Sequence, residues 1–247
     1  MPQSWLLSQL NLQQPGLWLL LSGLMGLAGV VALRLWPGLA QRAGWLSALR
    51  WLAVPYVGLL VGGLSPRRMG LSQIDWLAGA GWGVGMILAL LGLLWLIQSG
   101  DLNLHKSRAT AGTIPQPGPA SFVVLISGLQ EFHWAFLRGG LWSLLRTMDG
   151  TATGLPASLL AQPAYWAIWI AGALAVIELL VAGVRRIGPT EGLIQLFILL
   201  ATSVLFLYTR NFWLCWLLHT GMRLVLARSI TARNLPPQSP PAARRTE

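Results

Sequence analysis

Seven apolar segments, each long enough to cross a bilayer, dominate this sequence. A membrane-crossing helix needs about 20 consecutive, largely apolar residues. Runs of this kind lie at residues 16–36, 45–64, 75–98, 119–145, 163–184, 189–208 and 211–229. Hydrophobic residues make up 55% of the 247-residue chain and charged residues only 10%, against about 25% charged in soluble domains. The sequence therefore predicts an all-α fold, a polytopic integral membrane helix bundle of about seven transmembrane helices.

The segments between and around the apolar runs suggest the domain organisation. Residues 1–15 form an N-terminal segment, and residues 16–230 form one transmembrane domain. The Pro-rich tail, residues 231–247, is expected to be disordered because it has little apolar surface to bury. Only a few polar residues around "YTRN" separate the last two apolar runs, so these are expected to form a tight antiparallel hairpin.

The basic residues predict the orientation in the membrane. The chain has a formal net charge of +10, but its Lys and Arg residues are scattered through the connections. This distribution fits topology control and anionic lipid headgroups, and no nucleic-acid partner is expected. With an odd number of spans, one side holds four basic residues: Arg67, Arg68, Arg146 and Arg210. The other side, with the C-terminus, holds ten: Arg34, Arg42, Lys106, Arg108, Arg185, Arg186, Arg228, Arg233, Arg244 and Arg245.

We therefore expect a cytoplasmic C-terminus, in a bacterial plasma membrane or a thylakoid-like membrane, with the lipid bilayer as the first partner.

Ionisable residues inside the apolar runs are the candidates for function, because each costs about 2.5–3.5 kcal/mol on insertion scales. Glu131 and Arg138 are seven residues apart and share one helix face, whereas His133 points almost the opposite way. The helix at 119–145 must therefore be surrounded by other helices rather than lipid. Glu178 lies in the fifth run. In the seventh run Cys215, His219 and Arg223 recur every four residues and form one stripe.

Two interpretations of these residues remain open at this point. In one they form an internal network that docks helices to one another. In the other they line a polar cavity that binds a substrate or activates a water. Neither a cofactor nor a metal is predicted, although His133 or His219 could ligate a pigment, and His133, Glu178 and His219 could hold a metal if their helices converge. A transporter is disfavoured, because the polar residues cluster in the middle and late spans.

Two stretches resemble motifs of the CPBP family, the CAAX protease and bacteriocin-processing enzyme type of intramembrane endopeptidase. "YTRNFWLCWLLHTGMRLVL", residues 208–226, resembles the family's "TGNLW…LLH…N" helix, with His219 on the motif histidine. "HWAFLRGG", residues 133–140, resembles its "EExxxRG" helix, with Arg138 and Gly139 on the arginine and glycine. Residues 65–76, "SPRRMGLSQIDW", resemble the stretch ahead of that helix. The resemblance covers roughly residues 50–230.

Several motif positions are altered. The family's two glutamates fall on His133 and Trp134. In its middle motif, FxxxH, the histidine position falls on Glu178. The asparagine after the last histidine falls on Arg223.

The resemblance implies an intramembrane endopeptidase, a hydrolase acting on a membrane peptide or protein. His133 and Glu178 would be an exchanged acid–imidazole pair that activates water. Arg138 would hold a carboxylate, and His219 would stabilise the oxyanion. Glu131 and Arg223 would be accessory residues of the polar cavity. The alternative is a pseudoenzyme: a non-enzymatic accessory or assembly subunit of a larger membrane complex, such as a pigment–protein complex.

Overall fold

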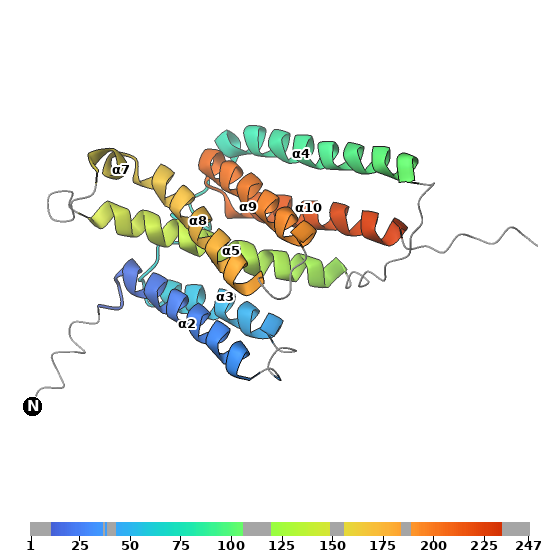
Figure 1. The fold of residues 1–247 in the computed structure, drawn as a ribbon. Coiled ribbons are helices and arrows are strands. Elements are labelled where there is room, and N and C mark those ends of the chain that lie inside the picture. Colours follow the sequence, from blue (N-terminus) through green and yellow to red (C-terminus); the bar gives the residue numbers. More distant parts are fainter. Residues whose placement is uncertain are drawn as a thin grey trace, which may run out of the picture.

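The computed structural model describes residues 11–36, 38, 43–105, 120–148, 156–183 and 189–233. These residues form helices and turns, with no β-strand among them (Figure 1). The helices are α2 (Pro15–Leu35), α3 (Ala43–Leu60), α4 (Trp76–His105), α5 (Ala120–Thr147), α7 (Ala157–Ala161), α8 (Pro163–Gly183), α9 (Pro189–Thr209) and α10 (Phe212–Arg233). The predicted all-α bundle is confirmed, and each predicted apolar run corresponds to one helix.

Five of the described helices are long and apolar enough to cross a membrane, fewer than the seven predicted. They are Pro15–Leu35, Trp76–Ile97, Ala120–Thr147, Pro163–Val181 and Glu191–Thr209. The apolar parts of α3 and α10 are shorter, at Trp45–Leu60 and Phe212–Leu226. At 1.5 Å per residue they span only about 24 and 22 Å, below the ~30 Å of a hydrocarbon core. The protein is a helical integral membrane protein in which two of the seven main helices have short apolar parts.

The helix α4 extends further than the apolar pattern predicted. The sequence indicated a polar loop from residue 99, but the helix continues to His105. A helix needs apolar side chains only within the hydrocarbon, so a polar helical extension beyond it is compatible with a membrane-spanning segment. The rest of the predicted loop, residues 106–119, and the tail from residue 234 lie outside the described residues.

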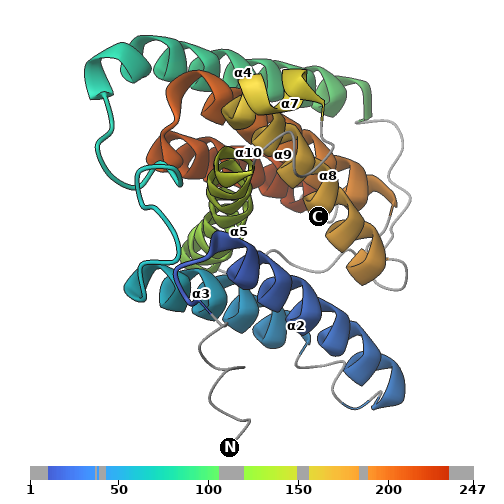
Figure 2. The ribbon, with the colours of Figure 1, turned by 90° about the vertical axis from the view of Figure 1, so that its left-hand side faces the viewer.

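Helix α5 lies at the centre of the bundle. Figure 2 shows it nearly end-on, between the α2–α3 pair on one side and α4, α9 and α10 on the other, with α8 alongside. It packs directly against α2, α3, α8 and α10. Every residue from 133 to 141 is buried, so the middle of this helix is surrounded by protein, as expected. Its first turns are not, since Phe122 is 47% and Leu125 52% exposed.

The connections alternate between the two ends of the bundle. α3, α5 and α9 all finish at one end, shown at the left of Figure 1. That end carries the four residues Arg67, Arg68, Arg146 and Arg210, and we call it the arginine end. The last helix, α10, finishes at the opposite end.

The arginine end is held together by close backbone packing. The turn between α9 and α10 is as tight as predicted: the Asn211 Oδ1 accepts hydrogen bonds from the N–H groups of Trp213 and Leu214, at 2.9 and 3.3 Å, and so caps α10. The Phe212 N–H donates to the Gly70 carbonyl at 3.0 Å. Gly70 has φ +73°, and a Cβ there would lie 2.7 Å from the Arg210 carbonyl oxygen. Glycine at position 70 is therefore required by both conformation and space.

The glycines near the start of α4 lie on two opposite sides of the helix, and only one of these sides packs closely against other helices. A Cβ on Gly83 would lie 2.6 Å from Leu214 Cδ1 and 3.3 Å from Thr209 Cγ2, and one on Gly79 would lie 3.7 Å from Thr209. Gly81 and Gly85 have nothing within 4 Å. The small residues thus let α4 approach α9 and α10 along the face shared by positions 79 and 83.

Gly83→Leu is expected to destabilise the bundle by about 1–3 kcal/mol through overpacking against α10. Gly85→Leu, two residues along on the exposed side, is the matched control and is expected to change stability by less than about 0.5 kcal/mol. Melting of the purified protein in detergent measures both. Equal melting temperatures for the two variants would contradict this packing.

Candidate functional site

A carboxylate at the middle of α5 organises the first of two polar clusters. Glu131 Oε1 accepts a hydrogen bond from Arg138 Nη1 at 2.7 Å, and Glu131 Oε2 lies 3.2 Å from His219 Nδ1. Glu131 and His219 have no solvent exposure, and Arg138 has 1%. The seven-residue spacing predicted from the sequence places the arginine on the same face as the acid, and α10 brings the histidine to the other oxygen. We call these three residues and the groups bonded to them the Glu131 cluster.

The hydrogen bonds around His219 define which ring nitrogen carries the proton. Arg223 Nε donates to His219 Nε2 at 3.1 Å. An arginine cannot accept, so Nε2 is the unprotonated nitrogen, and Nδ1–H donates to Glu131. Trp134 stacks on the imidazole, with ring centroids 5.0 Å apart and an interplanar angle of 21°. Both nitrogens and one face of the ring are therefore occupied by groups of the protein.

Polar side chains extend the Glu131 cluster towards α9. Arg138 Nη2 donates to Thr202 Oγ1 and Ser203 Oγ, both at 3.2 Å. Its guanidinium also lies 5.2 Å from the centre of the Phe206 ring. These contacts satisfy a guanidinium that is otherwise costly to bury among apolar side chains.

A chain of amides leads from the same cluster to the end of the bundle opposite the arginine end. Arg223 Nη2 donates to Gln130 Oε1 at 2.9 Å, and Gln130 Nε2 donates to Gln195 Oε1 at 3.0 Å. Gln195 Nε2 in turn donates to Glu191 at 3.2 Å. The Glu131 cluster thereby joins α5, α9 and α10 into one hydrogen-bonded unit.

The second cluster lies on the other side of α5. His133 Nε2 is 2.9 Å from Glu178 Oε2. Arg50 forms a two-pronged ion pair with the same carboxylate, Nη1 to Oε1 at 3.1 Å and Nη2 to Oε2 at 2.9 Å. The Arg50 Nη1 also donates to the Ser22 carbonyl at 3.1 Å, and a Cβ on Gly26 would lie 2.6 Å from that nitrogen. We call this the Glu178 cluster, and it ties α5 to α2, α3 and α8.

The two clusters differ in how deeply they are buried. His133 has 1% exposure and packs between the rings of Trp51 and Phe136, at centroid distances of 6.2 and 5.8 Å. Glu178 is more open, with 28% of its side chain exposed. The His133 Nδ1 is buried and has no hydrogen-bond partner in the described part of the chain.

The structure brings some of the predicted site residues together and separates others. His133 and Glu178 face each other, as the exchanged acid–imidazole pair requires. His219 lies instead with Glu131, Arg138 and Arg223, so the predicted site is divided between two clusters. Arg50 was not among the candidates, although an arginine alone within an apolar run is itself a signal that a carboxylate on another helix must meet it.

The geometry also bears on the metal-site alternative. That alternative required His133, Glu178 and His219 to converge. Within the described ranges, no three His, Cys, Asp or Glu side chains form a group that could hold a metal ion. Each histidine is instead paired with a single carboxylate.

Comparisons with protein-family models, with curated proteins and with solved structures found no match to this chain.

Glu131→Leu is expected to destabilise the protein by about 3–5 kcal/mol, because it leaves Arg138 charged and unpaired in the core. The double variant Glu131→Leu/Arg138→Met is expected to lose less than Glu131→Leu alone, since it removes the uncompensated charge as well. Unfolding in mixed micelles measures the difference.

Arg67→Met serves as the control, because it removes the charge of an exposed arginine at the arginine end; its effect should stay within about 0.5 kcal/mol. A double variant less stable than the single one would refute the role of this ion pair.

Proposed function

We propose that this protein is a non-enzymatic membrane scaffold on a CPBP-like bundle, an accessory or assembly subunit for other membrane proteins. The observation that carries the proposal is the complete burial of Glu131 and His219 among side chains that bond to them. Both oxygens of Glu131 and both ring nitrogens of His219 are already bonded to side chains of the bundle. A general base or an oxyanion donor must reach the reacting atoms at about 2.6–3.2 Å. Glu131 and His219 have no solvent exposure, so a substrate or a water has no open approach to them.

The altered motif positions support the same proposal. Trp134, where the family pattern has its second glutamate, stacks on His219. Arg223, where the pattern has an asparagine, donates to the remaining nitrogen of that histidine. Two departures from the pattern thus both contact the retained histidine and occupy it. Substitutions that fill a site with the protein's own side chains favour stability over chemistry.

The arrangement of the polar groups explains how such a scaffold is made rigid. Without water in the hydrocarbon, van der Waals packing and interhelical hydrogen bonds hold helices together. The Glu131 cluster fixes α9 and α10 on α5, and the Glu178 cluster fixes α2, α3 and α8. A rigid bundle of this kind can present its outer helices to a membrane protein partner.

We further propose that the arginine end faces away from the cytoplasm and that the C-terminus is cytoplasmic, in a bacterial plasma membrane or a thylakoid-like membrane. The support is the count of basic residues in the sequence, four in the connections of the arginine end against ten that the predicted topology assigns to the other side.

A second candidate, an intramembrane endopeptidase centred on the Glu178 cluster, is favoured by one observation. The pair of His133 and Glu178 is the acid–imidazole pair that the sequence predicted, and its carboxylate is partly exposed. In that mechanism the pair removes a proton from water, the hydroxide adds to the amide carbon, and the proton passes to the departing amine. His219 is bonded within the other cluster, so Arg50 is the cation left at this pair to stabilise the oxyanion.

Cleavage of CAAX-type peptides by the purified protein in proteoliposomes distinguishes the candidates. The scaffold proposal expects no turnover above protein-free vesicles in the wild type. If the endopeptidase candidate is right, Glu178→Gln and His133→Ala each lower turnover by about a hundredfold or more, while His219→Ala, in the other cluster, retains it.

Melting curves recorded on the same preparations separate loss of chemistry from loss of fold. Turnover in the wild type that disappears in Glu178→Gln at an unchanged melting temperature would overturn the scaffold proposal.

A further inference from the structure

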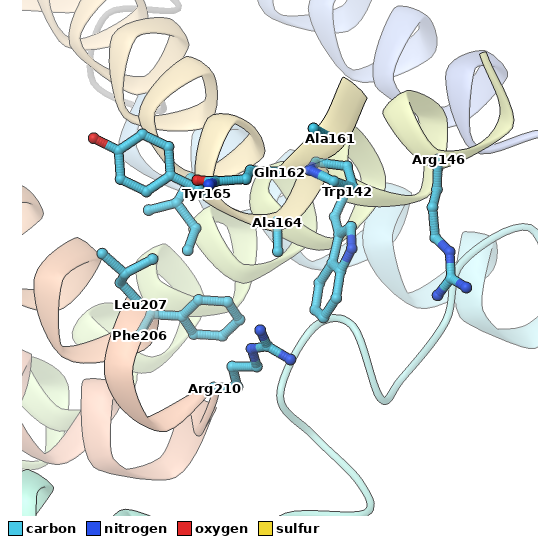
Figure 3. Close-up of a pocket in the computed structure, with 11 residues that line it drawn as sticks. Trp142, Arg146, Ala161, Gln162, Ala164, Tyr165, Phe206, Leu207 and Arg210 are labelled. Atoms are coloured by element: carbon cyan, nitrogen blue, oxygen red, sulfur yellow. The ribbon is translucent and has the colours of Figure 1, made fainter. Parts of the chain in front are cut away.

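A cavity of about 390 Å³ opens at the arginine end, and its lining includes none of the hydrogen-bonded residues of the two polar clusters. It lies where α5 ends, α8 begins and α9 ends, and Figure 3 shows the side chains around it. Its rim carries the cationic side chains of Arg146 and Arg210, and its apolar wall includes Ile168, Phe206 and Leu207. The volume falls within the range of about 300–1,000 Å³ that is typical of small-molecule sites.

Among the residues that the structure describes, the two arginines on the rim have no carboxylate partner. The described residues that line the cavity include no Asp or Glu, and neither guanidinium has an ion pair within the same part of the chain. Arg210 instead lies over the face of Trp142, 5.0 Å from the ring centre, as Figure 3 also shows. This stacking fixes the guanidinium at the mouth of the cavity and leaves its N–H donors available.

A third arginine, Arg68, adds to the positive charge around Arg146. Burial lowers the pKa of Arg68, and the positive charge of Arg146 lowers it further. Asp75, an acid at the same end, uses its Oδ1 to accept the Ala78 N–H at 3.0 Å at the start of α4. An anion bound between Arg146 and Arg210 would relieve this repulsion.

We propose that this cavity binds the phosphate headgroup of an anionic phospholipid. The planar guanidinium matches the geometry of phosphate oxygens. The site lies where the helices finish, the level at which headgroups meet hydrocarbon, and Trp142 and Tyr165 are aromatic residues of the kind enriched there. The apolar wall suits the start of an acyl chain, which a free phosphate ion lacks. This binding does not depend on the proposed scaffold function.

Lipid binding to the full-length protein in dodecyl maltoside, measured by native mass spectrometry, tests the proposal. The probes are phosphatidylglycerol, an uncharged diacylglycerol glycolipid and soluble glycerol phosphate. The wild type is expected to bind phosphatidylglycerol and neither of the other two. Arg146→Gln/Arg210→Gln is expected to weaken that binding by about tenfold or more, as the loss of charge-assisted hydrogen bonds implies.

Arg67→Gln is the matched control, because Arg67 is an exposed arginine at the same end that lines neither this cavity nor the neighbouring one of about 300 Å³. It should bind phosphatidylglycerol as the wild type does. If the double variant, without lipid, melts at a lower temperature than the wild type, the single variant Arg146→Gln is used for the test instead. If the glycolipid binds as well as phosphatidylglycerol, the cavity does not recognise phosphate. If glycerol phosphate binds equally well, the ligand need not be a lipid. If the arginine variants bind phosphatidylglycerol like the wild type, the lipid does not bind at this cavity.

Discussion

The ion pair between Glu131 and Arg138 on α5 is the interaction on which the rest of the bundle depends. A buried arginine and a buried carboxylate in the middle of a membrane helix cannot face lipid, because no water there can satisfy them. The face of α5 that carries them must therefore be covered by other helices. α9 supplies hydroxyl groups to Arg138, and α10 supplies His219 to the second oxygen of Glu131. The central position of α5 follows from these requirements.

The polar groups of the Glu178 cluster also need partners from other helices, on the opposite side of α5. His133 points away from Glu131, so it needs its own partners, and Glu178 and Arg50 provide them from α8 and α3. A single helix thus carries two polar centres about 200° apart, each of which ties a different set of helices to it. His133, Arg138, Glu178 and His219, the candidate site residues, are therefore also among the residues that hold the bundle together.

The charges of the arginine end are arranged differently. In the core every guanidinium meets a carboxylate, a hydroxyl, an amide or a ring nitrogen of the protein. At the end of the bundle Arg146 and Arg210 border a cavity whose lining, among the described residues, includes no acid. Paired charges in a water-free interior stabilise helix packing, whereas unpaired charges at the bilayer surface can attract anions from outside.

The sequence by itself determined the helical membrane class, the position of each main helix apart from the polar extension of α4 to His105, and the burial of the middle of α5. It could do so because apolar length and helical periodicity are local properties. It also identified Glu131, His133, Arg138, Glu178 and His219 as the residues needing partners. Only the tertiary structure decided which partner each one took: His133 with Glu178, His219 with Glu131, and Arg50 with Glu178. Those choices depend on how helices distant in the sequence are rotated and placed against one another, and side-chain spacing within one helix carries no information about that.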